Sequence, residues 1–551
     1  MASLLTEVDM AEREWDRNWE EGEGATRKVG SRRQWGYLAW VLAIVGFAAL
    51  HALHLRADFP NGSPWVFDWA KYTDEGWYGN GAVRAHLFGS WYAAGDFNPA
   101  AAVPAWPFLE WLLFFATGVK VEAARGLAVA CFAVSVVLSY LLVRSGGSRW
   151  TALAAVTLAV TSPFLYCFSR LAILEPLETT LTLAALNAAV RLPRMKRREV
   201  GAAGVGLLLA LAALTKTTAV FLVPAAIWAI WVGLRNERRV ALRCALTAVS
   251  ATGIVYGLWV AWVVRLGLLG DYKYYFFVNN YPKPAGVLWP VTALWWSIHG
   301  LLWVDHSVVF LAGGMVLGAG VAWRTKWGRG LWRAPVFGAS ILAVAGFVLF
   351  MTVQNHPQPR YFAVPAFFCY FVAAMGAEGL LRLKGWRRAP GWVAIAAIVG
   401  SAGVHGVRTI GYAFHPEYTF VNAAEELTQY IDGHPNGRRM LVSISGDEIA
   451  LVTGLPGLCD DFGTMDLPSK LAKYQPGWYA SWNDIDAGTL EDLHAHYSLE
   501  EAATFRAFDD PDRNELVLFK LHPLPGGLER DGQKQNLREA LPGDKIEVPV
   551  E

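Results

Sequence analysis

The sequence predicts an α-helical polytopic membrane protein with about eleven transmembrane helices and a small extracytoplasmic α/β domain at its C-terminus. Three observations favour this fold class. Of the 551 residues, 54% are hydrophobic and only 17% are charged, whereas soluble domains carry about a quarter charged residues. Apolar runs long enough to cross a hydrocarbon core of about 30 Å recur between short basic segments. Acidic residues gather after the last of these runs.

The composition also limits the classes of function. Apolar residues are plentiful and there are only five cysteines, which excludes a disordered chain and a disulfide-stapled scaffold. The net charge of +1 conceals an asymmetry, because the residues from Tyr412 onward hold 25 acidic and 11 basic side chains. Basic residues occur in short clusters between apolar runs rather than on one face, so we expect no nucleic-acid partner.

The apolar runs locate the expected membrane spans. In chain order these are residues 35–55, 122–143, 150–168, 171–190, 200–214, 217–234, 244–266, 297–323, 334–352, 361–381 and 391–408.

The spans divide the chain into regions. We expect an N-terminal tail (1–34), a transmembrane domain (35–408) with external loops at 56–107 and 267–296, an α/β domain (409–525) and a polar, flexible end (526–551).

Clusters of Lys and Arg predict the orientation, because cytoplasmic loops of membrane proteins are enriched in these residues. The clusters lie at 27–33, 191–198, 235–243, 324–333 and 382–388. All of them fall on one side of the membrane if the N-terminus is cytoplasmic. We therefore expect a multi-pass protein of the cell membrane, in contact with membrane lipids, whose acidic C-terminal domain is extracytoplasmic.

Local patterns predict elements outside the spans. In the first external loop, Thr73 is the expected N-cap of an amphipathic helix that lies on the membrane surface. In the C-terminal domain we expect helices at 421–431 and 447–453 and strands at 439–444, 477–482 and 515–521. No Gly-rich phosphate loop follows a strand there, so a nucleotide site is not expected.

Asp74 and Glu75 begin the expected helix of the first external loop. Two acidic residues at a helix N-terminus are electrostatically favoured, which is a purely structural interpretation. Alternatively, a carboxylate held just above the bilayer can act as general base on an acceptor hydroxyl. These two residues alone favour neither interpretation.

The motifs around this pair narrow the choice. Asp74-Glu-Gly-Trp-Tyr-Gly-Asn-Gly81 is followed by Gly95-Asp-Phe-Asn-Pro99 and by Pro104-Ala-Trp-Pro107. This order resembles the first periplasmic loop of the GT-C glycosyltransferases, above all the protein O-mannosyltransferases and the lipid A aminoarabinose transferases. The acidic-basic pair that the aminoarabinose transferases carry before the Pro-rich turn is not found at 101–107.

Three later motifs extend the resemblance to about residues 35–408. They are Ser169-Arg-Leu-Ala-Ile-Leu-Glu-Pro176, Leu214-Thr-Lys-Thr-Thr218 and His356-Pro-Gln-Pro-Arg-Tyr361. The resemblance implies a catalytic base at Asp74, with Glu75 positioning Asp74 or the acceptor. It further implies a donor-phosphate site and supporting residues, which are Arg170, Lys216 and Arg360, and then Glu175, Tyr361 and His356.

Each of these residues has a structural alternative. Arg170 and Glu175 could form an ion pair at membrane depth, and Lys216 and Arg360 could extend to the membrane interface. Asp305 and His306, near the eighth span, could line a donor cavity or bind a divalent cation with Glu75. A His–Asp hydrogen bond that faces other helices is the simpler interpretation, and no metal site is predicted.

The resemblance implies an inverting glycosyltransferase that moves a hexose or pentose from a polyprenyl-phosphate carrier to an extracytoplasmic protein, lipid or glycan. Two alternatives stay open. One is a polytopic lipid or glycolipid transporter or flippase, although the chain shows no paired, similar halves. The other is a non-catalytic scaffold with the same fold. Glu110, which follows the first external loop, and His86 are expected at the surface or at the membrane interface.

Overall fold

The computed structural model describes residues 30–279, 287, 289–352 and 358–525. Residues up to Ala49 form one compact unit, and residues from Leu50 onward form another. The described part of the first unit is helix α2 (Gly30–Leu50), whose last residue begins the second unit. Most of the expected N-terminal tail (1–34), and the whole polar end (526–551), lie outside the described residues.

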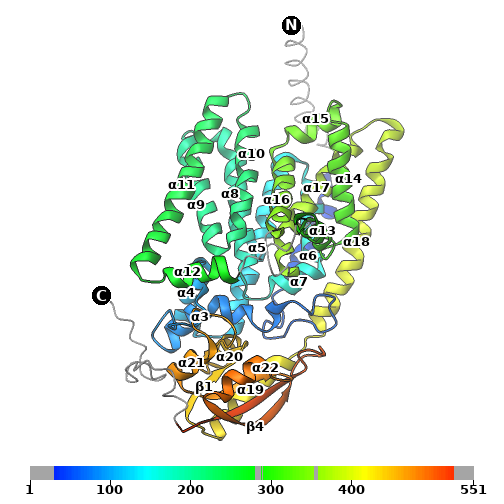
Figure 1. The fold of residues 1–551 in the computed structure, drawn as a ribbon. Coiled ribbons are helices and arrows are strands. Elements are labelled where there is room, and N and C mark those ends of the chain that lie inside the picture. Colours follow the sequence, from blue (N-terminus) through cyan, green and yellow to red (C-terminus); the bar gives the residue numbers. More distant parts are fainter. Residues whose placement is uncertain (1–29, 280–286, 288, 353–357, 526–551) are drawn as a thin grey trace. The chain divides into compact units, whose positions relative to one another are not determined.

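The second unit is helical up to Phe414, and its helices run side by side in a bundle (Figure 1). Their apolar surfaces pack closely, with Ala, Leu, Val and Phe filling the interior. The helices are α4 (Ala105–Thr117), α5 (Val121–Gly146), α6 (Arg149–Thr161), α7 (Pro163–Ser169), α8 (Leu174–Arg191), α9 (Arg198–Thr215), α10 (Val223–Gly233), α11 (Arg238–Arg265), α12 (Leu269–Lys273), α13 (Trp289–Leu301), α14 (His306–Val321), α15 (Lys326–Arg333), α16 (Pro335–Met351), α17 (Ala363–Leu381) and α18 (Ala389–Phe414).

Among the described residues, five helices are long and apolar enough to cross a membrane, or up to eight if each bent pair is one span. Every expected span contains at least one helix, but the number eleven stays a prediction. Two expected spans contain a bend, and a third begins at one. Helices α6 and α7 meet at 65° and α15 and α16 at 74°, in both cases where a proline begins the second helix.

The expected span over 297–323 is broken in the structure, and its status as one span stays a prediction. Helices α13 and α14 meet there at 117°. The physical reason is a new helix start, because Asp305 accepts a hydrogen bond from the backbone N–H of Val308 and so caps α14.

The C-terminal segment contains one five-stranded mixed sheet with the strand order β2-β1-β3-β5-β4. Strand β1 pairs in parallel with β2 and β3, and β5 pairs antiparallel with β3 and β4. The strands are β1 (Arg438–Val442), β2 (Gly457–Leu458), β3 (Pro476–Trp482), β4 (Tyr497–Arg506) and β5 (Glu515–Pro523). The helices between and before them are α19 (Thr419–Gly433), α20 (Gly446–Thr453), α21 (Leu467–Tyr474) and α22 (Ala487–His494).

Alternation along the strands gives the sheet two apolar faces. Leu441 and Trp478 pack on the side of α19 and α20, while Val442 and Tyr479 pack on the side of α21 and α22. Both faces are therefore covered by helices.

The five elements expected in this segment are present, each within two residues at either end. Strand β4 was not expected. It lies at the sheet edge, and most of its side chains, including those of Glu500 and Glu501, are exposed or only partly buried. A polar edge strand shows little of the hydrophobic alternation on which sequence reasoning relies. The domain boundary at 409 stays a prediction, since the segment belongs to the same compact unit as the bundle.

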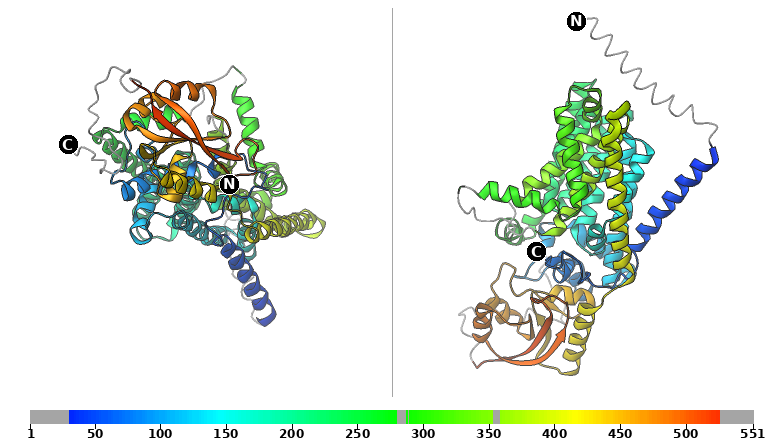
Figure 2. Two further views of the ribbon diagram at one scale, coloured as in Figure 1. Left: turned by 90° about the horizontal axis from the view of Figure 1, so that it is seen from below. Right: turned by 90° about the vertical axis from the view of Figure 1, so that its right-hand side faces the viewer.

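Helix α3 (Asp74–Leu87) lies where the bundle and the sheet-bearing segment meet (Figures 1 and 2). The expectation of an amphipathic helix on the membrane surface is not met, because all residues from Asp74 to Arg84 are buried. Helix α4 covers one side of α3 and helix α20 another. A helix without an exposed face has no polar side to turn to water.

Candidate functional site

Asp74, the first residue of α3, meets Arg360 in the short helix η6 (Pro359–Phe362) that precedes α17. The Oδ2 atom of Asp74 lies 2.6 Å from Nη2 of Arg360. Arg360 also donates from Nη1 to Asp68 at 2.5 Å and from its backbone N–H to Asp68 at 2.9 Å. All three residues are buried, so one guanidinium holds two carboxylates away from water.

A second buried pair lies beside the first. Lys216, at the C-terminal end of α9, donates a hydrogen bond to Glu175 in the first turn of α8. The Nζ atom of Lys216 is 3.9 Å from the centre of the Tyr361 ring. The Nε atom of Arg360 is 4.0 Å from Glu175, which joins the two pairs.

We call these five residues the charged cluster. They come from four separate parts of the chain and are Asp68, Asp74, Glu175, Lys216 and Arg360.

Several polar atoms of the charged cluster remain unsatisfied. Among the described residues, Nε of Arg360 and Oε2 of Glu175 have no hydrogen-bond partner, whereas Oδ2 of Asp74 has only its ion pair with Arg360. Leaving a buried polar group unpaired costs about 1–3 kcal/mol, and more for a charged group. The N–H at Nε of Arg360 and the Oε2 atom of Glu175 are therefore a free donor and a free acceptor within the charged cluster.

The pKa of the Asp74 carboxyl is raised towards neutral pH. Burial raises its pKa to about 6; Arg360 opposes this rise, and the carboxylates of Asp68 and Glu175 add to it. A carboxyl with a pKa of about 6 is largely ionised at neutral pH, and it is a stronger base than an exposed aspartate.

The other acidic residue of the pair points elsewhere. Glu75 accepts two hydrogen bonds from Arg125 of α5, at 2.8 and 2.6 Å, and one from the backbone N–H of Ala172 at 2.7 Å. On an α-helix, neighbouring residues are about 100° apart, so Asp74 and Glu75 face different partners. Glu75 ties α3 to the bundle and makes no described contact with the charged cluster.

Arg170 is also placed apart from the charged cluster. It donates to the hydroxyl of Tyr166 and, at 2.6 Å each, to the backbone carbonyls of Leu53 and His54. The described contacts of Glu175 are with Lys216 and Arg360, so Glu175 is not the partner of Arg170.

The remaining residues singled out from the sequence lie elsewhere. Asp305 accepts a hydrogen bond from Ser401 of α18 and is 3.4 Å from His405, whereas His306 is exposed. Asp305 therefore contacts a histidine, but one from another helix. His356 lies outside the described residues. Within the described part of the chain, no three or more His, Cys, Asp or Glu side chains are arranged to hold a metal ion.

Sequence reasoning missed several buried carboxylates near α3, among them Asp68 and Glu110. Asp68 accepts from the backbone N–H of Ala70 as well as from Arg360, and no motif distinguishes it. Glu110 is fully buried, which contradicts its expected place at the surface. The reason is Gly79 of α3, because its missing side chain leaves room for the Glu110 carboxylate. An acidic residue in an apolar segment was the available signal.

Comparisons with known proteins agree with this architecture. A family model described as dolichyl-phosphate-mannose-protein mannosyltransferase matches residues 99–262. No curated protein sequence matches the chain at a significant level.

Two solved structures of ArnT from Cupriavidus metallidurans share the fold. The apo structure is 14% identical, with a TM-score of 0.55 over 88% of this chain and 98% of that chain. The structure bound to undecaprenyl phosphate is 12% identical, with a TM-score of 0.55 over 89% and 98%.

The archaeal oligosaccharyltransferase AglB from Archaeoglobus fulgidus, in complex with an inhibitory peptide and a dolichol-phosphate, is also similar. It is 12% identical, with a TM-score of 0.51 over 88% of this chain and 76% of that chain. The resemblance to the GT-C glycosyltransferases predicted from the sequence motifs is thus confirmed, and the chain has their fold.

The Lys216–Glu175 pair gives a test of this geometry. Replacing Lys216 with Met leaves Glu175 buried without its cation, which costs about 3–5 kcal/mol when a buried pair is broken. We expect a lower Tm for Lys216→Met and recovery of at least part of the loss in Lys216→Met/Glu175→Gln. Thermal unfolding of the detergent-purified protein, followed by tryptophan fluorescence, measures both. An unchanged Tm for the single variant would contradict a buried pair.

Proposed function

We propose that this chain, which shares the fold of the GT-C glycosyltransferases, moves a sugar from a polyprenyl-phosphate carrier to an acceptor outside the cytoplasm. The observation that carries the proposal is the charged cluster. It combines a buried carboxyl of pKa about 6, at Asp74, with two buried cations, Lys216 and Arg360. Transfer of a sugar from a phosphodiester needs a base for the acceptor hydroxyl and cations that stabilise the departing phosphate.

Lys216 and Arg360 bind the donor phosphate in this proposal. The phosphodiester of such a donor has a single negative charge, and the unpartnered Nε–H of Arg360 is a donor for one of its oxygens. An arginine can also contact phosphate through two N–H groups at once, which lysine cannot. Before the donor arrives, the carboxylates of the charged cluster hold both cations in place.

Asp74 then acts as the base. The acceptor hydroxyl gives its proton to Asp74 while its oxygen attacks the anomeric carbon of the sugar. The bond from that carbon to the phosphate oxygen breaks, and its electron pair leaves with the polyprenyl phosphate. Lys216 and Arg360 stabilise the charge that develops on this leaving group. A single displacement inverts the anomeric configuration.

Similar proteins support a lipid carrier. ArnT has been solved with undecaprenyl phosphate and AglB with a dolichol-phosphate. The matching family model is described by its use of dolichyl-phosphate-mannose. For this chain we propose a hexose or pentose as the transferred sugar and a protein, lipid or glycan as the acceptor.

The other residues are proposed in lesser roles. Glu75 positions Asp74 through α3, while Glu175 and Tyr361 support the cations. Arg170 has one unpartnered N–H among the described residues, at Nε, with which it would contact the carrier phosphate. His356, which lies outside the described residues, stays a proposed supporting residue.

The site implies an orientation as well. Acceptors outside the cytoplasm require the charged cluster to face outward, as the basic clusters predict. We therefore propose a cytoplasmic N-terminus, an extracytoplasmic sheet-bearing segment and a place in the cell membrane.

Asp74→Asn tests the catalytic base. We expect turnover to fall by at least about 10²-fold, because the amide cannot accept the proton that a general base removes. The measurement is the release of polyprenyl phosphate from a panel of radiolabelled polyprenyl-phosphate hexoses and pentoses, with a membrane extract as acceptor. Asp432→Asn, which changes an exposed carboxylate, is the matched control. Undiminished turnover by Asp74→Asn would remove Asp74 from this role.

The pH profile provides a second test of Asp74. The base must be ionised, and its pKa is raised to about 6. We therefore expect kcat/KM to rise with pH, to level off above about pH 7 and to be about tenfold lower at pH 5. The residual activity of Asp74→Asn should lack this step. A wild-type profile that is flat between pH 5 and pH 7 would contradict the assignment.

Donor binding is tested by Arg360→Gln. We expect native mass spectrometry of the wild type to detect bound polyprenyl phosphate, and Arg360→Gln to lose it, because the cation that holds the phosphate is gone. Arg506→Gln, which changes an exposed arginine, should retain it. Binding with vectorial movement but without turnover would instead favour a transporter, and no binding at all would contradict the proposal.

A further inference from the structure

Helix α20 of the sheet-bearing segment packs on the side of α3 that faces away from the charged cluster. Three residues of α3 make this contact, namely Gly76, Asn80 and Arg84. They are spaced by four and so form one stripe along the helix. Asp74 lies about 200° around the helix from Gly76 and faces Arg360. One rigid helix thus joins α20 to the charged cluster.

The first contact lies at the start of α3. The Oε2 atom of Glu448 accepts a hydrogen bond of 2.6 Å from the backbone N–H of Gly76. Thr73 occupies the N-cap position but makes no side-chain cap bond, because its hydroxyl donates to the carbonyl of Trp69 and to Asp74. A residue 372 positions away therefore binds an N–H group that a local cap would normally bind.

Gly76 permits this close approach. A Cβ atom at Gly76 would overlap the backbone of Asp447 and Glu448. The contact between the two helices is thus made by backbone against backbone at this point. Even a small displacement of α20 would be transmitted to the first turn of α3, which carries Asp74.

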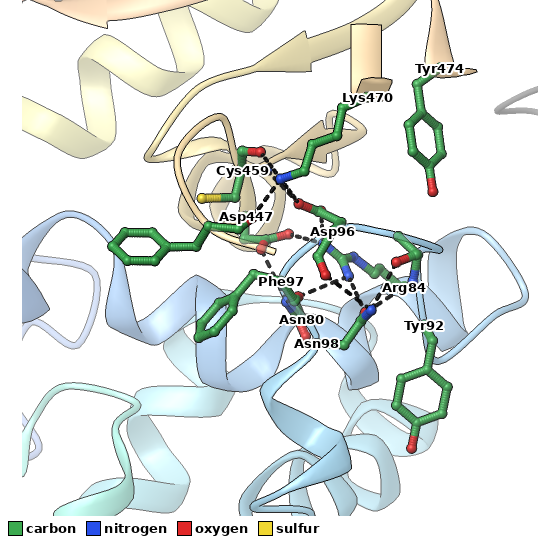
Figure 3. Close-up of polar contacts among 12 residues, drawn as sticks. Asn80, Arg84, Tyr92, Asp96, Phe97, Asn98, Asp447, Cys459, Lys470 and Tyr474 are labelled. Atoms are coloured by element: carbon green, nitrogen blue, oxygen red, sulfur yellow. Dashed lines mark hydrogen bonds and ion pairs between the residues drawn. The ribbon is translucent and has the colours of Figure 1, made fainter. Parts of the chain in front are cut away.

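The second contact fixes the middle and the far end of α3. Asp447 accepts hydrogen bonds from Arg84 at 2.9 Å and from Asn80 at 3.1 Å. Arg84 also binds Asp96 at 2.6 Å, and Lys470 binds Asp96 at 3.0 Å. Figure 3 shows how these side chains meet where α3 and the segment that follows it contact the sheet-bearing segment. All of them are buried, so the network is protected from competition by water.

We propose that Glu448 is a positioning residue for Asp74, and that the sheet-bearing segment is a working part of the active site. Glu448 fixes the first turn of α3 and thereby the direction in which the Asp74 carboxylate points at Arg360. This inference rests on the proposed function of Asp74 as base. Glu448 does not touch the charged cluster in any described contact, so it acts through the helix.

The hydrogen bond between Glu448 and the N–H of Gly76 does not require Glu448 to be charged. Burial raises the pKa of Glu448 well above its usual range, and the nearby carboxylate of Glu75 adds to the rise. Its partner at Gly76 is a neutral N–H group, to which a carbonyl oxygen serves as well as a carboxylate. Glutamine should therefore replace Glu448, whereas alanine should not.

The test compares Glu448→Ala and Glu448→Gln with the wild type in the full-length protein. The donor is the polyprenyl-phosphate sugar of the panel that the wild type turns over fastest. We expect Glu448→Ala to lower kcat by about 10–100-fold, since small misplacements of a catalytic group have effects of this size. The KM for the donor should stay within about threefold, because Lys216 and Arg360 keep their places. Glu448→Gln should stay close to the wild type, as should the control Asp432→Ala, which removes an exposed carboxylate from the same segment.

Other outcomes would overturn the inference. Wild-type kcat in Glu448→Ala would show that the contact has no bearing on Asp74. A parallel loss of kcat, donor affinity and Tm in Glu448→Ala would show a merely structural role. Loss of kcat in Glu448→Gln equal to that in Glu448→Ala would show that the hydrogen bond to Gly76 is not the cause.

Hydrogen–deuterium exchange separates this inference from the proposed function. If the wild type turns over no donor, the proposed function fails, but the hold of Glu448 on α3 can still be measured. Faster exchange in the peptide that covers residues 74–84 of Glu448→Ala, with protection restored in Glu448→Gln, supports that hold. Unchanged exchange in Glu448→Ala overturns it whatever the activity.

Discussion

The buried pairing of Arg360 with Asp68 and Asp74 is the interaction on which the rest of the site depends. A guanidinium and two carboxylates away from water are tolerated only if their geometry is favourable and their remaining atoms find partners. This requirement fixes η6, the segment before α3 and the first turn of α3 relative to one another. The buried pair of Lys216 and Glu175 fixes α8 and α9 relative to each other in the same way. The charged cluster is therefore preorganised by its own electrostatics.

The cluster is also incomplete in a way that suits a ligand. It holds three carboxylates and two cations, and among the described residues it leaves Nε of Arg360 and Oε2 of Glu175 without a hydrogen-bond partner. Burial raises the pKa of Asp74 to about 6, and the neighbouring carboxylates of Asp68 and Glu175 add to this rise while Arg360 opposes it. The carboxylates of the charged cluster also hold the cations of Lys216 and Arg360 in place.

Helix α3 distributes its buried residues among three neighbours. Asp74 faces the charged cluster, Glu75 binds Arg125 of α5, and Gly76 lies against Glu448 of α20. Buried polar groups on the helix are favourable only where they find partners, and these three contacts supply them. This arrangement also makes the sheet-bearing segment part of the same cooperative unit as the bundle.

The sequence by itself determined the helical membrane class, three strands of the C-terminal sheet and the candidates Asp74, Lys216 and Arg360. These follow from apolar runs, from periodicity and from short motifs, all of which are local properties of the chain. Only the tertiary structure decided that Lys216 rather than Arg170 pairs with Glu175, and that Asp68 and Glu448 take part. The reason is physical, because a buried charge takes the partner that folding brings within reach, and residues such as Gly76 and Glu448 meet across 372 positions of sequence.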